Sequence, residues 1–301
     1  MIKHFLYVML LGIVSVVLAA QDDAVILGVL EDIRGVYAGQ SNRRKVRILF
    51  TRKDSKWIVY QSECSEPECL RTITNQYPRD VHWFVGLDGR KIGEVMARTP
   101  RDFGFYAHIG LQDIISGTAP VIGKRSHEFS GFDGGEVYRP LVTISKPYFK
   151  DPALWKRVKV TSQIRKQAYT LLGDKGPSVC KEGPSDAQPL VPLRYGAEDL
   201  GIRAHRSKDG WLIMTVTVEG AYYCNGGDGD GDGLLDAQTF AIDPAGTAQF
   251  LGAGLMLVDA ADYDGDGRSE LMFALSLYNR GGYVLFSDDL TEQARFVFSY
   301  H

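Results

Sequence analysis

The sequence lacks a strong excess of either charge. Its 301 residues carry 34 Lys and Arg against 37 Asp and Glu, which leaves a formal net charge of −3. Proteins that hold nucleic acid or anionic lipid through their overall field need a strongly basic surface. The sequence has only one short basic cluster, "NRRKVR" at residues 42–47. We interpret it as a solvated strand edge or loop, with a docking patch for an acidic partner as the alternative, and we predict no nucleic-acid partner.

Motifs that mark catalytic sites are also missing. The chain contains no G-x-S-x-G, no H-E-x-x-H and no glycine pattern for binding nucleotide phosphates. The histidines show no metal-ligand spacing; they are His4, His82, His108, His127, His205 and His301. The absence of these motifs favours a non-catalytic role. A secreted polysaccharide hydrolase or lyase is the alternative, because two carboxylates that only folding brings together would leave no motif and tryptophans can stack on sugars.

Long apolar runs are missing beyond the N-terminus. Residues 5–18 form an apolar run of about 14 residues that follows Lys3 and His4 and precedes Ala19 and Ala20. This run is shorter than the roughly 20 residues that span a bilayer, and it has the order of a signal peptide. We predict a signal peptide over residues 1–20, a periplasmic or secreted protein, and no membrane span after cleavage. An uncleaved N-terminal anchor helix is the alternative.

Cysteine is scarce, with four residues: Cys64, Cys69, Cys180 and Cys224. An even number in an exported chain predicts disulfides. Cys64 and Cys69 flank the turn-like "SEPE", so we favour Cys64–Cys69 and Cys180–Cys224 among the three pairings. A four-cysteine zinc site is the alternative, but zinc ligands usually come in closely spaced pairs and neither Cys180 nor Cys224 has a close partner.

Sustained helical periodicity is missing, and turn signals recur about every ten residues instead. We expect hairpins that turn at residues 53–56, 88–89, 209–210, 243–246 and 288–289. Residues 24–35 fit a short helix or a strand, and the spacing of Val25, Val29 and Ile33 favours the helix. "AYTLLG" at residues 168–173 is assigned to a strand. The pattern predicts an all-β fold of the sandwich, barrel or propeller kind.

A soft domain boundary is expected at residues 173–192. This stretch, "GDKGPSVCKEGPSDAQPLVP", is rich in proline and glycine. It would separate a β-rich N-terminal region, residues 21–175, from a C-terminal β region, residues 193–301. One long loop inside a single domain explains the composition equally well.

Two acidic stretches share the template D-x-D-x-D-G-x-x-D/E, 34 residues apart. The first, in "CNGGDGDGDGLLDAQ", supplies Asp228, Asp230, Asp232 and Asp236, and the second, in "DYDGDGRSE", supplies Asp262, Asp264, Asp266 and Glu270. Calcium takes six to eight oxygen ligands, and a glycine in the sixth place permits the sharp turn. The seventh-place carbonyls, of Leu234 and Arg268, would add one oxygen each. The repeat predicts two Ca²⁺ sites; a flexible spacer and a magnesium site are the alternatives.

The flanks of these loops predict strands rather than the helices of an EF-hand. An EF-hand also needs a bidentate glutamate in the twelfth place, where this chain has Thr239 and Phe273. The apolar runs "GLMLVDAA" before the second loop and "LMFALSLY" after it are typical of buried strands. We therefore expect each loop to connect two strands, with the ninth-place acid replacing the missing glutamate.

The stretch "AADYDGDGRSELMFAL" resembles the FG-GAP repeat, also called the VCBS type, of integrin-like β-propellers. The resemblance covers about 80 residues at the C-terminus and implies the ligand sets given above. It also implies a β-propeller-like fold, complete or with degenerate or missing blades, or a separate β-domain followed by two blade-like units. We expect an exported calcium-binding β-protein with a binding or structural role and an unknown protein or polysaccharide ligand. A purely structural envelope protein is a further possibility.

Overall fold

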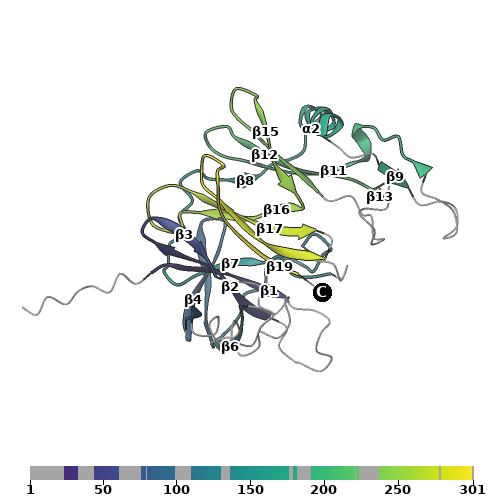
Figure 1. Ribbon diagram of the computed structural model, residues 1–301. Helices are drawn as coiled ribbons and strands as arrows, with labels where there is room; N and C mark the ends of the chain where they lie inside the picture. Colours follow the sequence, from purple (N-terminus) through teal and green to yellow (C-terminus); the bar gives the residue numbers. More distant parts are fainter. Residues whose placement is uncertain are drawn as a thin grey trace, which may run out of the picture.

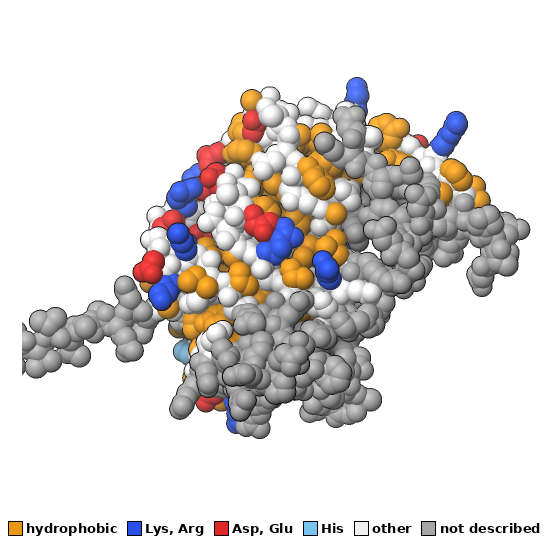
Figure 2. All heavy atoms as spheres, viewed as in Figure 1, with side chains coloured by type: hydrophobic (Ala, Val, Ile, Leu, Met, Phe, Trp, Pro, Cys, Tyr) orange, Lys and Arg blue, Asp and Glu red, His pale blue; other side chains and the backbone are white. Residues whose placement is uncertain are grey.

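The computed structural model describes residues 24–32, 44–60, 76–78, 80–98, 110–129, 136–175, 179–181, 191–220, 222–223, 237–277 and 279–299. These residues fold mainly into antiparallel strands, arranged in several sheets (Figure 1), which confirms the prediction of an all-β protein. No helix in the described ranges is long and apolar enough to cross a membrane. On the face shown in Figure 2, acidic and basic side chains lie close together over the described part, in keeping with the small net charge.

Six strands of the N-terminal half close into a ring. Their order is β1-β7-β4-β5-β6-β2, and pairing of β1 with β2 closes it. Side chains such as Trp83, Val85 and Val95 form one core of this ring, and Trp83 Nε1 donates a hydrogen bond to Gln112 Oε1 at 2.7 Å. The edge strand β3, Lys56–Val59, extends the sheet from β2. The ring strands are β1 Ile26–Asp32, β2 Arg44–Lys53, β4 Val81–Leu87, β5 Arg90–Ala97, β6 Leu111–Gly117 and β7 Leu141–Ile144.

A four-stranded meander packs on the outside of the ring. It runs β16 Leu255–Ala261, β17 Glu270–Leu277, β18 Arg280–Phe286 and β19 Glu292–Ser299, in that spatial order. Leu27, Phe50 and Val142 of the ring share one core with Tyr283 and Phe296 of the meander. The junction between the two halves of the chain is therefore a buried apolar interface.

The other face of the meander packs on a second sheet, and a helix covers that sheet from the far side. Ile213 and Ala241 meet meander residues such as Phe273, whereas Met214 and Phe240 face the helix α2, Ser162–Lys175. The ring, the meander, this sheet and α2 thus form successive layers (Figure 1). The sheet has the order β15-β14-β12-β11-β8, with strands β8 Lys156–Arg157, β11 Leu200–Arg206, β12 Leu212–Val218, β14 Gln238–Ile242 and β15 Ala248–Ala253.

A small three-stranded sheet lies beside these layers. It has the order β10-β9-β13, with β9 Val179–Lys181, β10 Val191–Pro192 and β13 Tyr222–Tyr223. Together with the end of α2, β9 and β10 are the described parts of the stretch 173–192, where the sequence suggests a boundary. A short 3₁₀ turn, η2 Ala197–Asp199, precedes β11.

The predicted hairpin turns are confirmed, and two local assignments are wrong. Residues 26–32 form strand β1 and not a helix. The strand is buried on both faces, so its apolar residues follow one another almost without a break, and the four-residue spacing of Val25, Val29 and Ile33 did not indicate a helix. "AYTLLG" lies in the helix α2. There Ile164, Ala168 and Leu172 recur every four residues toward the core, and Thr161 Oγ1 accepts the N–H of Ile164 at 3.2 Å as a helix cap.

The finer expectation of a β-propeller has no support in the described residues. Six strands close a single ring, and the two larger C-terminal sheets stack on each other with a helix over the outermost one. The blade-like feature that the structure does contain is the four-stranded meander β16–β19, whose first connection is the second acidic loop.

Candidate metal centre

The second acidic loop, residues 262–269, connects β16 to β17 where the meander meets the ring. The Asp262 N–H donates to the Lys150 carbonyl at 2.8 Å, which ties the start of the loop to the segment that follows β7. Gly265 and Gly267 have φ angles of +79° and +88°, in the left-handed region that glycine enters without a Cβ penalty. Their N–H groups donate to Asp262 Oδ1 and Oδ2 at 2.7 and 2.9 Å. The loop therefore curls around the Asp262 carboxylate.

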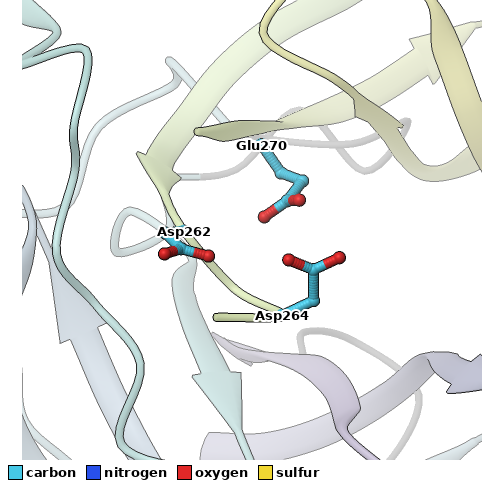
Figure 3. Close-up of side chains that lie close together, drawn as sticks. All are labelled: Asp262, Asp264 and Glu270. Carbon is cyan, nitrogen blue, oxygen red and sulfur yellow. The ribbon is translucent and has the colours of Figure 1, made fainter. Parts of the chain in front are cut away.

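Three predicted ligands converge on one point. Asp262, Asp264 and Glu270 each offer a carboxylate oxygen, and these oxygens lie within 4.8 Å of one another. Figure 3 shows the Glu270 side chain reaching from β17 toward Asp264, with Asp262 to one side. Two oxygens on a shared Ca²⁺ stand at most about 5 Å apart, because each Ca–O distance is about 2.3–2.6 Å. These three carboxylates could therefore hold a metal ion.

The fourth predicted carboxylate of this loop, Asp266, is not part of that group. Asp266 accepts the Arg268 N–H on Oδ1 at 2.8 Å, and its own N–H donates to Asp264 Oδ1 at 3.1 Å. The Arg268 side chain turns to Asp288 in the β18–β19 turn, where Nε lies 3.0 Å from each carboxylate oxygen. These contacts order the loop and leave the Asp266 carboxylate outside the group of three.

Glu270 is almost completely buried, with 6% of the residue exposed. Its Oε2 accepts the Tyr263 N–H at 2.7 Å. Burial, followed by the nearby charges of Asp264, Asp266 and Asp262, raises the pKa of Glu270 to about 8. Ionised Glu270 is thus costly in the absence of a cation, and a bound Ca²⁺ would turn the repulsion among these acids into attraction.

Asp264 faces a cation that the sequence did not suggest. Its side chain is 3% exposed, and Arg52 Nη2 from strand β2 lies 2.6 Å from Asp264 Oδ2. Burial raises the pKa of Asp264, and the Arg52 charge opposes that rise. In the sequence, Arg52 stands out only as the residue before the hairpin turn predicted at residues 53–56. No local pattern pairs it with Asp264, since only the packing of the meander on the ring brings them together.

A buried hydrogen-bond network supports the loop from behind. Asp151 accepts hydrogen bonds from Ser269 Oγ and from the Trp155 N–H, both at 2.6 Å, and this fixes the residue before β17. The Asp88 N–H in the β4–β5 turn donates to Asp259 Oδ1 on β16 at 2.9 Å. Burial raises the pKa of Asp259 to about 7. The Asp88 contact connects the ring to β16 before the loop, and the Asp151 contacts connect the segment after β7 to the residue that precedes β17.

Several predicted site residues lie outside the described residues. They are the whole first acidic set, Asp228, Asp230, Asp232, Leu234 and Asp236, and the cysteines Cys64, Cys69 and Cys224. Cys180 on β9 is disulfide-bonded, and it pairs across the sheet with Tyr222 of β13, two residues before Cys224. The zinc alternative is therefore wrong for Cys180, and its pairing with Cys224 stays a prediction.

Comparisons with known proteins give no relatives. No model of a known protein family matches the chain, and no curated protein or solved structure is significantly similar to it. The resemblance to the FG-GAP repeat stays a prediction from residues 255–275.

Proposed function

We propose that residues 262–270 bind Ca²⁺ and that the ion stabilises an exported β-protein with a binding or structural role. The observation that carries this proposal is the convergence of Asp262, Asp264 and Glu270, of which Asp264 and Glu270 have buried side chains and raised pKa values. Hard oxygen donors suit calcium and magnesium, and magnesium prefers fewer protein ligands and keeps more of its waters. A loop that brings three carboxylates together favours calcium.

Each residue of the loop has a role in this proposal. Asp262, Asp264 and Glu270 hold the ion with their carboxylates. Asp266 and the Arg268 carbonyl complete the set that the resemblance implies. The first acidic loop, with Asp228, Asp230, Asp232, the Leu234 carbonyl and Asp236, is proposed as a second Ca²⁺ site on the same template.

The proposed role of the ion is to stabilise the acidic loop where the meander meets the ring. The loop already touches the ring side through the Lys150 carbonyl and through Arg52. Calcium would neutralise the acids that face this junction, so ion binding and local folding would be coupled. The partner is proposed to be a protein or a polysaccharide outside the cytoplasm, and the export signal is proposed to be residues 1–20, which lie outside the described residues.

Thermal unfolding with and without calcium tests the proposal. We expect the midpoint to rise when calcium is added to metal-free protein, because a ligand that binds only the folded state stabilises it. Exported calcium modules have Kd values of about 10⁻⁴–10⁻³ M, and a concentration of about 100 Kd adds about 2.7 kcal/mol to the free energy of unfolding.

Magnesium at the same concentration is the matched control and should give a smaller rise. An unchanged midpoint, together with purified protein that contains no calcium, would contradict the proposal.

A further inference from the structure

Arg52 is positioned to compete with the proposed ion. Its Nη2 is 2.6 Å from Asp264 Oδ2, a buried oxygen with no hydrogen bond to any described residue. Asp264 Oδ1 already accepts the Asp266 N–H, so the guanidinium lies against the carboxylate oxygen that the loop itself leaves without a donor. The Arg52 side chain is itself only 20% exposed, so solvent screens this pair weakly.

The rest of the fold holds Arg52 in this position. Its backbone N–H donates to the Val25 carbonyl at 2.8 Å, and it pairs with Trp57 across the β2–β3 hairpin. The guanidinium carbon lies 5.4 Å from the centre of the Trp57 ring, within the range of a cation–π contact. Arg52 therefore presents a fixed positive charge to the loop from a different layer of the protein.

Two roles are physically distinct for such a residue. An arginine that only orients a ligand carboxylate would increase the affinity of the site, as outer-shell partners of metal ligands do. An arginine whose positive charge lies close to the bound ion would repel it and lower the affinity of the site for calcium. Adding one Ca–O bond to the 2.6 Å ion-pair distance places a Ca²⁺ on Asp264 about 5 Å from the guanidinium nitrogen. Like charges at that separation repel appreciably even in water.

We propose that Arg52 is a tethered counter-cation of the acidic loop. It neutralises Asp264 when no ion is bound, holds the loop on the ring in that state, and lowers the affinity for calcium. This inference rests on the calcium site proposed above. It gives the chain a loop that stays docked at low calcium and responds to calcium only at the high concentrations found outside cells.

Isothermal titration of metal-free protein with calcium tests the inference. Arg52→Gln is expected to bind calcium about tenfold more tightly than the unsubstituted protein, because one positive charge next to the ion is removed. Its melting midpoint without calcium is expected to fall, so the rise on adding calcium becomes larger. Arg52→Met retains an unbranched apolar stem against Trp57 and is expected to give the same change in affinity if the glutamine variant folds poorly.

Two further variants are controls. Arg52→Lys retains the charge and should bind calcium with nearly the original affinity. Arg295→Gln removes the same charge from an exposed pair with Glu292 and should also leave the affinity unchanged. If the original protein binds calcium and both Arg52→Gln and Arg52→Met bind it equally or more weakly, the role proposed for Arg52 is wrong. The calcium site itself would still stand. If neither the original protein nor these variants bound calcium, the site itself would be wrong.

Discussion

Glu270→Gln is expected to stabilise the metal-free protein at high pH and to remove most of its response to calcium. Glutamine has the shape of glutamate, and its carbonyl can still accept the Tyr263 N–H that Glu270 accepts at 2.7 Å. The substitution therefore removes the charge while leaving this hydrogen bond and the packing in place. The two expected effects have opposite signs because the charge is unfavourable without an ion and favourable with one.

The pH dependence follows from the pKa of Glu270. Its folded-state pKa of about 8 lies above its ordinary value of 4.5, so the folded protein binds the proton more tightly than the unfolded chain does. This contribution to stability is complete below pH 4.5 and is lost as the pH rises to about 8. Glutamine stays neutral, so the advantage of the variant should be absent at low pH and should reach a few kcal/mol, at about 1.4 kcal/mol per pKa unit, at high pH.

Chemical unfolding of both proteins between acid and alkaline pH measures the first effect, and calcium titration at alkaline pH measures the second. We expect the variant to bind calcium about 10- to 100-fold more weakly, since even loss of an outer-shell partner of a metal ligand has an effect of that size. A variant that is less stable than the original when metal-free at high pH, or that retains the full calcium response, would contradict the role given to Glu270.

Arg47→Ala is expected to lower the free energy of unfolding by about 3–5 kcal/mol, because it leaves a buried carboxylate without its cation. Arg47 is 2% exposed, and its Nε donates to Glu31 Oε1 at 2.6 Å. Tyr283 on the meander donates to Glu31 Oε2 at 2.8 Å, and the Arg47 guanidinium lies 4.3 Å from the ring centre of Phe298. The pair therefore connects two ring strands to the meander inside a region that excludes water.

Two variants separate this buried pair from a general effect of charge. Lys45→Ala, on the same strand, breaks an ion pair with the exposed Asp113 and should change stability by less than about 1 kcal/mol. The double variant Arg47→Met with Glu31→Gln removes both charges and should recover most of the loss. Chemical unfolding measures all three, and equal losses for Lys45→Ala and Arg47→Ala would show that burial of the pair does not matter.

Local sequence signals predicted the hairpins well and the layers poorly. The Asp88–Gly89 and Asp209–Gly210 turns lie where expected, because turn chemistry is encoded within a few residues. The helix α2 was missed because its buried stripe is short and interrupted by polar residues. The sequence named a barrel among three possible β architectures but did not single out a closed ring. The ring depends on the pairing of β1 with both β2 and β7, and the second of these contacts joins residues more than 100 positions apart.

For the candidate site, the sequence predicted the three carboxylates that the structure brings together and not their surroundings. The template D-x-D-x-D-G-x-x-E identified Asp262, Asp264 and Glu270, because a tight loop brings its own alternate residues together. Arg52 and Asp151 come from distant segments, and only the packing of the meander on the ring places them beside the loop. Contacts between distant segments leave no local pattern in the sequence. The Arg52–Asp264 contact, on which the proposed lowering of the calcium affinity depends, is one of them.

The most direct test of the account is to locate calcium in crystals of the protein grown with the ion at about 10 mM, well above the Kd of exported calcium modules. Anomalous scattering from calcium should give a peak between Asp262, Asp264 and Glu270, with carboxylate oxygens at about 2.3–2.6 Å from it. An ordered loop with no peak at that position would contradict the central claim that residues 262–270 form a calcium site.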